Sequence, residues 1–251
     1  MNGATADAWR ERLVREFAGD PTVGRWVVVD ETGSTQDLAR EVDPGTAVTA
    51  LRQVAGRGRL GRAWADTGLD GLAVTFALPP ASGADPWLAI ASALAAARAI
   101  EAVAGLAVGI KWPNDLVLAG QKLGGILIER TARATLVGIG INVTQIDFPD
   151  GVAATATSLA RAGRPVPRLE LLVALARGLP AALAEPIASR EAEFARRDAL
   201  RGGWIRGTSA GEPVEGRVLA VEPVHGIRLE AGNGERFVPA ATASILAWRP
   251  A

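Results

Sequence analysis

The spacing of hydrophobic residues along the chain predicts helices and strands that alternate over the first 200 residues. Trp9, Leu13 and Phe17 recur at helical spacing, whereas the β-branched run at residues 25–30 is typical of a buried strand. Helices are predicted over residues 7–17, 86–104 and 169–199, the last of them interrupted near Pro180 and Pro186. Strands are predicted over residues 25–30, 47–52, 72–78, 108–112, 115–118, 122–129 and 135–143.

Ser34 has the features of a helix N-cap. Asp37 follows it three residues later, in a pattern close to a capping box, and Leu38 comes directly afterwards. The Ser34 hydroxyl can therefore cap a helix, and this structural role leaves it able to face a ligand as well.

The pattern changes near residue 205. From there, short β-type runs alternate with glycine and proline turns, which is the signature of a small antiparallel barrel of about 45 residues. These runs lie at residues 215–221, 226–230, 236–238 and 244–248. We therefore predict two domains, residues 1–205 and residues 206–251.

Composition narrows the possible chemistry. Lysine plus arginine and aspartate plus glutamate number 27 each, so the formal net charge is zero and a surface that binds polyanions globally is not indicated. Cysteine is absent and His225 is the single histidine, which excludes thiolate catalysis, disulfides and Cys/His zinc sites. The apolar run at residues 87–97 is too short to cross a membrane, and no secretory signal is visible, so we expect a cytoplasmic protein without a membrane partner.

The first segment that carries chemistry is QVAGRGRLGRAW, residues 53–64, in which three glycines alternate with three arginines. Glycine permits close backbone approach, and the forked guanidinium matches phosphate or carboxylate. The segment is neither a Walker A motif nor a Rossmann fingerprint. It is either an anion-binding loop that orders over a ligand or a solvated loop that binds nucleic acid nonspecifically.

The two lysines of the chain, Lys111 and Lys122, each open a further motif. Lys111 begins KWPNDL, where the strand period places it on the face opposite Ile110 and Trp112. Ordinary turn chemistry also accounts for the Pro-Asn-Asp sequence. The presence of Lys111 shortly before this sequence argues against a turn with no other role.

Glycines recur along two adjacent predicted strands. Lys122 opens KLGGIL, and in the segment VGIGINV the residues Gly138, Gly140 and Asn142 share one face. Glycines weaken a strand, so their presence on one face indicates that a ligand or another backbone lies flat against it. Close packing of the sheet against a helix is the competing interpretation.

Together these motifs supply Arg57, Arg59, Lys111 and Lys122 but no side chain that looks like a nucleophile. Such a set suits a reaction that joins two anions, for example a carboxylate that attacks the α-phosphate of ATP. Mg²⁺ would screen the triphosphate further.

In these motifs the chain resembles the biotin protein ligases. The matching elements are Gly33-Ser34-Thr35, Gln53 with the loop at residues 56–62, Trp64, KWPNDL at 111–116, KLGGIL at 122–127 and GIGINV at 138–143. The resemblance covers about residues 25–250 in the order of the family.

The resemblance implies an enzyme with a two-step reaction. Biotin and MgATP form biotinyl-5′-AMP and pyrophosphate, and a lysine of a biotin carboxyl carrier protein, or of the carrier domain of a biotin-dependent carboxylase, then accepts the biotinyl group. The implied fold is α+β: a mixed β-sheet backed by helices, like that of class II aminoacyl-tRNA synthetases, followed by a small SH3-like β-barrel.

The resemblance also implies roles for individual residues. The ureido ring of biotin is expected at Ser34, Thr35 and Gln53, and the reacting carboxylate and phosphate at Arg57, Arg59, Lys111 and Lys122. Asp115 is the candidate that orients or deprotonates the incoming lysine. Further binding residues are expected at Gly56, Gly58, Trp64 near the adenylate, Asn114, Gly124, Gly125 and Asn142 on the adenosine side.

Two features depart from the family pattern. Gln36 stands where family members often have asparagine, so no contact is assigned to it. Only 33 residues precede Ser34 in this sequence, too few for the winged-helix domain of longer members, so we expect no DNA partner. The alternatives are a lipoate or octanoate ligase and a nucleic-acid-binding module that uses the loop Arg57–Arg62.

Overall fold

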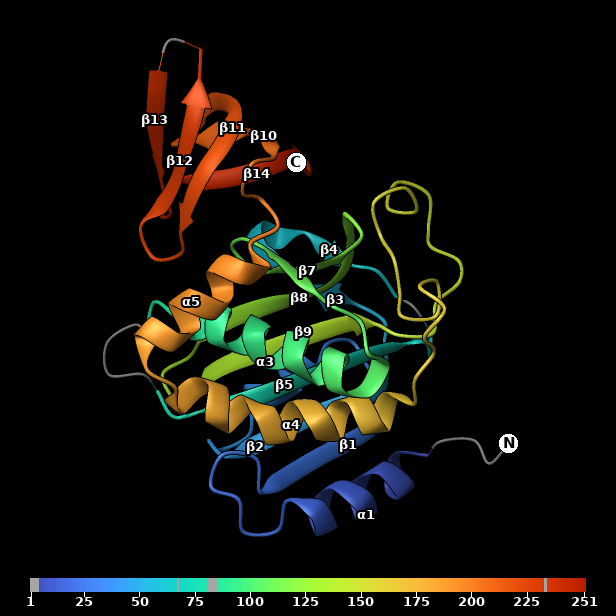
Figure 1. Ribbon diagram of the computed structural model, residues 1–251. Coiled ribbons are helices and arrows are strands. Elements are labelled where there is room, and N and C mark those ends of the chain that lie inside the picture. The colour runs from blue at the N-terminus through green and yellow to red at the C-terminus, as the bar shows by residue number, and fades with distance from the viewer. Residues whose placement is uncertain (1–4, 67, 81–84, 233) are drawn as a thin grey trace.

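A computed structural model describes residues 5–66, 68–80, 85–232 and 234–251 (Figure 1). The helices are α1 (Ala6–Glu16), α2 (Thr35–Ala39), α3 (Leu88–Ala104), α4 (Arg168–Ala184) and α5 (Ile187–Arg197), with a 3-10 turn η1 (Arg59–Gly61). The strands are β1 (Arg25–Thr32), β2 (Thr46–Gln53), β3 (Gly56–Arg57), β4 (Ala63–Trp64), β5 (Gly71–Leu78), β6 (Gly109–Lys111), β7 (Asp115–Leu118), β8 (Gln121–Arg130), β9 (Thr135–Asn142), β10 (Trp204–Ser209), β11 (Glu212–Glu222), β12 (Gly226–Ala231), β13 (Gly234–Pro239) and β14 (Ala243–Arg249). Within the described ranges, none of the helices has the length and hydropathy that a membrane span requires.

Seven strands form one mixed sheet in the order β1-β2-β5-β9-β8-β7-β6. The pair β1–β2 is parallel and the other pairs are antiparallel, which confirms the predicted mixed sheet backed by helices. The strands predicted at residues 25–30, 47–52, 72–78, 108–112, 115–118, 122–129 and 135–143 all occur, most with shifts of one or two residues at their ends.

The two faces of this sheet carry different helices. Along β2, Ala47 belongs to the main core that α3 and α4 cover, whereas the next residue, Val48, belongs to a smaller cluster with Ala39 of α2. Because successive strand residues point to opposite faces, α2 lies on the face away from α3 and α4. The strand β9 shows the same alternation: Val137 faces the main core and Leu136 the smaller cluster.

The helical segment predicted at residues 169–199 differs from the structure at one of the two prolines where an interruption was predicted. The predicted interruption at Pro180 is wrong, because α4 continues through this residue to Ala184. Buried residues on both sides of Pro180, Leu175 and Leu179 before it and Ala182 after it, hold the helix against the core. This packing outweighs the roughly 3 kcal/mol that a proline costs inside a helix through its lost hydrogen bond and the clash of its ring. The interruption at Pro186 is confirmed, since this residue is the N-cap of α5.

The predicted N-cap at Ser34 is confirmed. The Ser34 hydroxyl accepts a hydrogen bond from the backbone N–H of Gln36 at 3.3 Å. The capping-box half of the prediction is wrong, because the Asp37 side chain pairs instead with Arg57.

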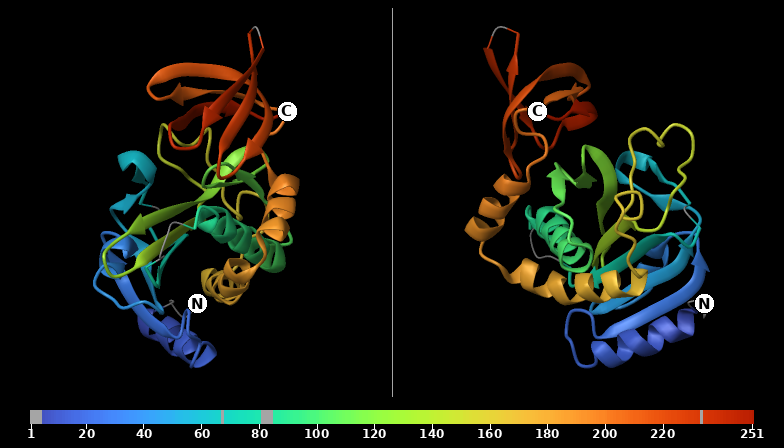
Figure 2. Two further views of the ribbon diagram at one scale, coloured as in Figure 1. Left: turned by 90° about the vertical axis from the view of Figure 1, so that its left-hand side faces the viewer. Right: turned by 45° about the vertical axis from the view of Figure 1, so that its right-hand side comes forward.

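The last strands form a second, five-stranded antiparallel sheet in the order β13-β12-β11-β10-β14, which we call the terminal sheet. It stands beyond α5 at one end of the molecule, and α1 lies at the other end (Figure 2). Its edge strands β13 and β14 are not paired with each other in the described part of the chain, so the predicted antiparallel sheet is confirmed and closure of the barrel stays a prediction. The predicted boundary after residue 205 falls inside β10, and the division into two domains stays a prediction.

Candidate active site

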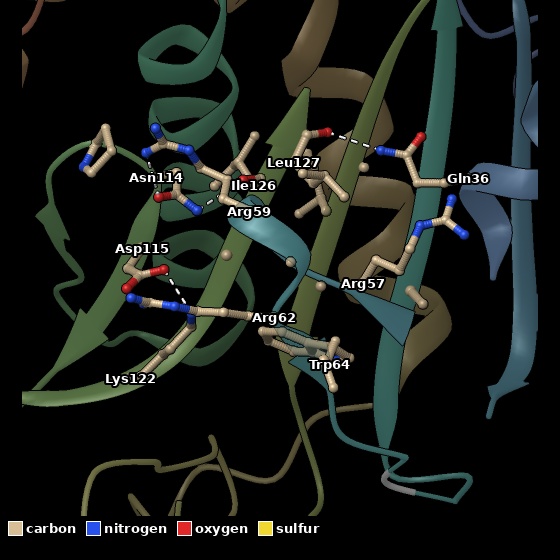
Figure 3. Close-up of a pocket in the computed structure, with 18 of the residues that line it drawn as sticks. Gln36, Arg57, Arg59, Arg62, Trp64, Asn114, Asp115, Lys122, Ile126 and Leu127 are labelled. Atoms are coloured by element: carbon tan, nitrogen blue, oxygen red, sulfur yellow. Dashed lines mark hydrogen bonds and ion pairs between the residues drawn. The ribbon is translucent and has the colours of Figure 1, made fainter. Parts of the chain in front are cut away.

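A cavity of about 280 Å³ opens on the α2 face of the seven-stranded sheet (Figure 3). Its floor is formed by β8 and β9, and one wall comes from the segment that joins β6 to β7. The short hairpin β3–β4 lies across it, and three residues of β14, Ala243, Ser244 and Ile245, close it from the terminal sheet. Stretches that are far apart in the sequence therefore meet at this cavity.

The predicted glycine and arginine loop is the hairpin β3–β4. Gly56 pairs with Trp64, and Arg57 pairs with Ala63. The turn between them is η1, closed by a 2.7 Å hydrogen bond from the Gly58 N–H to the Arg62 carbonyl. Glycine is needed at position 56, because a Cβ there would lie 2.9 Å from the Cβ of Trp64.

One side of the cavity carries uncharged polar side chains, Ser34, Thr35, Gln36 and Gln53, and we call it the polar end. The Gln53 Oε1 accepts hydrogen bonds from the Thr35 N–H at 2.9 Å and from its hydroxyl at 3.1 Å. The Gln36 Nε2 donates to the Leu127 carbonyl at 3.1 Å. The Gln36 Oε1 is buried and has no hydrogen-bond partner among the described residues.

The opposite side gathers positive charge, and we call it the cationic end (Figure 3). The Lys122 Nζ lies 2.7 Å from one carboxylate oxygen of Asp115, and the Lys111 Nζ lies 3.3 Å from the other. Arg59 donates to the Asn114 Oδ1 at 3.3 Å, and Arg62 extends toward Asp115. Asp115 is the one carboxylate among the described lining residues, so four cations share a single anion.

Strand register explains why these side chains meet. Asp115 begins β7 directly after the turn, where it pairs with Lys111 on one side and Gly125 on the other. The predicted strand at residues 115–118 is thus confirmed from its first residue, and the predicted face of Lys111 is confirmed as well, because Ile110 and Trp112 are buried on the other side.

Burial changes the electrostatics of the cationic end. Desolvation lowers the pKa of the Lys111 ammonium below its ordinary value, although Asp115 acts in the opposite direction. Desolvation likewise lowers the pKa of the Arg59 guanidinium. Charges held in such a partly dry setting attract an anion more strongly than the same charges would in water.

Arg57 has a protein partner that was not predicted from the sequence. It lines the cavity, but its guanidinium forms a bidentate pair with Asp37, with N–O distances of 2.8 and 2.7 Å. This hydrogen bonding lowers the pKa of the Asp37 carboxyl. Both guanidinium nitrogens that would bind a carboxylate or phosphate are thus paired with Asp37, and the expected contact of Arg57 with the ligand stays a prediction.

Three predicted binding residues, Gly56, Gly124 and Asn142, do not line the cavity. Gly124 serves strand packing, because a Cβ there would lie 2.6 Å from the Gly140 carbonyl oxygen. The Asn142 amide is buried and donates to the Thr157 carbonyl at 2.9 Å. The other predicted residues line it: Ser34, Thr35, Gln53, Arg57, Gly58, Arg59, Trp64, Lys111, Asn114, Asp115, Lys122 and Gly125.

The glycine face of β9 is filled largely by protein side chains. A Cβ at Gly138 would lie 2.8 Å from the Gln36 Nε2, and one at Gly140 would lie 3.0 Å from the Trp64 ring. The competing interpretation, in which these glycines allow a helix to pack closely on the sheet, is therefore confirmed at Gly138, because Gln36 belongs to α2. Both glycines also line the cavity.

Sequence reasoning missed several lining residues, among them Gln36, Arg62, Val152 and Ser244. Arg62 could have been found, since it is the third arginine of the same loop. Ser244 carried no local signal, because it reaches the cavity only through the placement of the terminal sheet. No group of three His, Cys, Asp or Glu side chains suited to a metal ion occurs among the described residues.

Comparison with known proteins shows which families and proteins this chain is similar to. Residues 27–145 match the model of the Biotin/lipoate A/B protein ligase family. The chain is 41% identical over 160 residues to the bifunctional ligase/repressor BirA of Bacillus spizizenii, covering 60% of this chain and 49% of that protein. It is 38% identical over 153 residues to the biotin–[acetyl-CoA-carboxylase] ligase of Mycobacterium tuberculosis, covering 56% of each.

A solved structure extends the similarity to most of the chain. The biotin protein ligase from Aquifex aeolicus, in complex with biotin and ATP, superposes with a TM-score of 0.81 at 26% identity. The match covers 91% of this chain and 100% of that one. The chain spans about half the length of the sequence relatives that it matches.

Proposed function

We propose that the protein is an ATP-dependent biotin protein ligase, starting from the match of residues 27–145 to the model of the Biotin/lipoate A/B protein ligase family. In the first step, a carboxylate oxygen of biotin bonds to the α-phosphorus of ATP and pyrophosphate leaves. In the second step, the ε-amine of an acceptor lysine attacks the acyl carbon, AMP leaves, and an amide remains.

The observation that carries this proposal is the difference in polarity between the two ends of this cavity. Its polar end suits a ring that both donates and accepts hydrogen bonds, and its cationic end suits two anions brought into contact. Lys111, Lys122, Arg59 and Arg62 line the end of the cavity to which we assign the attack, where negative charge would build up. Positive charge held in place before the reaction lowers the barrier that repulsion between the two anions creates.

The polar end favours biotin over lipoate, the other acid named by the family. Ser34, Thr35 and Gln36 are each less than 5% exposed, and the Gln36 Oε1 has no partner within the described part of the chain. An apolar ring would leave the Gln36 Oε1 unpaired, and a site built around hydrogen bonds rejects a ligand that cannot make them by a large factor.

We assign Asp115 to the second step. Its carboxylate lies between two ammonium groups, which keeps it close to the reacting atoms and oriented by both lysines. A lysine that enters from solvent is protonated and must lose a proton before it attacks, and Asp115 is the carboxylate in position to receive that proton or to orient the amine.

Mg²⁺ enters this scheme with the nucleotide, as part of MgATP. The described residues hold no cluster of ligands for a resident ion, and Asp115 is already paired with two lysines. This fits an ion that takes its ligands mainly from the phosphates and water. The acceptor that we propose is a lysine of a biotin carboxyl carrier protein or carrier domain.

The proposal is tested by incubating the protein with MgATP and either biotin or lipoate, quenching with acid, and analysing the acyl-adenylate and pyrophosphate by mass spectrometry. We expect biotinyl-5′-AMP with biotin and no adenylate with lipoate. An adenylate with lipoate alone would move the protein to the lipoate branch of the family. Folded protein that forms neither adenylate would contradict a ligase function.

A second prediction concerns the terminal sheet. The Trp112 Nε1–H donates to the Pro223 carbonyl at 2.9 Å, and this bond ties the KWPND segment to the turn after β11. We expect Trp112→Phe to remove about 1 kcal/mol of hydrogen bonding while it keeps the apolar ring buried. Because β14 closes the cavity, the KM for ATP should rise severalfold in initial-rate measurements. An unchanged KM would show that the terminal sheet does not shape the nucleotide site.

A further inference from the structure

Four charged side chains form a network behind the polar end of the cavity. Arg57 pairs with both oxygens of Asp37 and lies 3.7 Å from Glu129. Arg40 binds the same Glu129 at 2.8 Å and lies 3.8 Å from Asp37. Two of these residues belong to α2 and its C-cap, one to the hairpin, and one to β8, so the network joins three separate elements.

The charges of this network cancel, whereas those of the cationic end do not. Arg40 and Arg57 are matched by Asp37 and Glu129. At the other end of the cavity, four cations face Asp115 alone among the described lining residues. Arg57 is therefore held by its own counter-ions, and it adds little net charge for an incoming phosphate.

The hairpin β3–β4 depends on such anchors for its position. Each of its strands has two residues, far fewer than an isolated hairpin needs to be stable in water. Trp64 fixes one strand by packing against Gly140, and Arg59 fixes the turn by its bond to Asn114. The other strand is fixed by Arg57 on Asp37, directly beside the residues of the polar end.

We propose that Asp37 is a positioning residue that acts through Arg57 and holds the hairpin β3–β4 closed over the polar end of the cavity. This inference rests on the proposed function, because the hairpin then covers the ring of biotin. A planar guanidinium can pair with both carboxylate oxygens, and a lysine ammonium cannot reproduce that geometry. The role of Arg57 is thus to position the loop, and the charge at the reacting atoms comes from the other cations.

The network is half-exposed, and this exposure determines how much its removal should change global stability and the opening of the hairpin. The side chains of Arg57 and Asp37 are 36% and 54% exposed. Exposed pairs contribute little to global stability, so removing this one should leave the melting temperature nearly unchanged. Opening of a two-residue strand is a local event of low free energy, and we expect it to become roughly three- to tenfold more frequent.

The test uses Asp37→Asn, Arg57→Gln and the double variant of the full chain. Amide hydrogen exchange of the hairpin, residues 56–64, is measured without substrates, and KM for biotin and kcat are measured for adenylate formation. We expect faster exchange and a raised KM in all three variants, with kcat at saturating biotin unchanged. The double variant should be no worse than Arg57→Gln, because both substitutions remove the same pair.

Glu235→Gln is the matched control. It removes a half-exposed carboxylate from an arginine pair in the terminal sheet, Arg228–Glu235, and should leave hairpin exchange unchanged. Hairpin exchange that Asp37→Asn does not alter would overturn the proposal. A loss of kcat in Arg57→Gln that adds to the effect of Asp37→Asn would also overturn it, since Arg57 would then contact the reacting groups.

Failure of this inference can be told apart from failure of the proposed function. Hairpin exchange is measured on substrate-free protein, so it decides whether Asp37 holds the hairpin even if the wild-type protein forms no biotinyl-5′-AMP. Absence of the adenylate in the wild type would count against the ligase function alone.

Discussion

Replacing Lys122 with alanine is expected to slow the formation of biotinyl-5′-AMP by about 10- to 150-fold while the protein stays folded. The estimate follows from the loss of one charged hydrogen bond, roughly 1.5–3 kcal/mol. The Lys122 ammonium lies 2.7 Å from Asp115 and 5.6 Å from the centre of the Trp64 ring, so it stands at the cationic end with its charge directed into the cavity. Its side chain is 41% exposed, so its ion pair should contribute less than about 1 kcal/mol to stability.

The measurement is a rapid-quench assay of the first turnover, together with thermal unfolding of the same preparation. Arg130→Ala is the matched control, because Arg130 is an exposed cation at the far end of the same strand and does not line the cavity. We expect this control to react at the wild-type rate. A Lys122→Ala protein that unfolds where the wild type is stable would show that Lys122 is structural.

The second large effect is expected from alanine substitutions at two neighbouring glycines, Gly124 and Gly125, which should change different properties of the protein. A Cβ at Gly124 would lie 2.6 Å from the backbone carbonyl oxygen of Gly140, which cannot move without disturbing the pairing of β8 with β9. Gly124→Ala is therefore expected to destabilise the protein by about 1–3 kcal/mol. In thermal unfolding, this corresponds to a fall in melting temperature of roughly 2–12 °C.

Gly125→Ala should behave in the opposite way. A Cβ at this position would lie 3.5 Å from the Asp115 Oδ1 and 3.6 Å from the Lys122 Nζ, which are ordinary contacts. The fold should be unaffected, but the methyl group fills space beside the ion pair, and we expect KM for biotin to rise about tenfold. If both variants changed stability equally, the assignment of Gly124 to packing and Gly125 to the cavity would be wrong.

Much of the candidate site was predictable because its residues come from short stretches of regular structure. Lys111, Asp115 and Gly125 meet through the register of adjacent antiparallel strands, and the strand period already places Lys111 on the side opposite the buried Ile110. The N-cap role of Ser34 was predictable from the residues that follow it, whereas the place of Ser34 and Thr35 in the site was expected from the resemblance to the biotin protein ligases.

Other parts were not predictable, because charge and size do not specify a partner. Arg57 and Arg59 are two residues apart in one loop, yet Arg57 pairs with Asp37 outside the reacting end and Arg59 binds Asn114 within it. Asn142 shares a strand face with Gly138 and Gly140, but its amide donates a hydrogen bond to the carbonyl of Thr157, which lies in a loop 15 residues further along the chain. These outcomes depend on which distant segment arrives at each side chain.

By itself, the sequence determined the elements of this protein, the face that each strand residue presents, and the cations that an anion-joining reaction requires. Those properties follow from local periodicity and from side-chain chemistry, which act over a few residues. Only the tertiary structure decided that Asp37 pairs with Arg57, that Gln36 lies at the polar end, and that Ser244 lines the cavity although it is more than a hundred residues from the strands β8 and β9. The reason is that these contacts join segments with no local coupling, so the packing of the whole chain selects them.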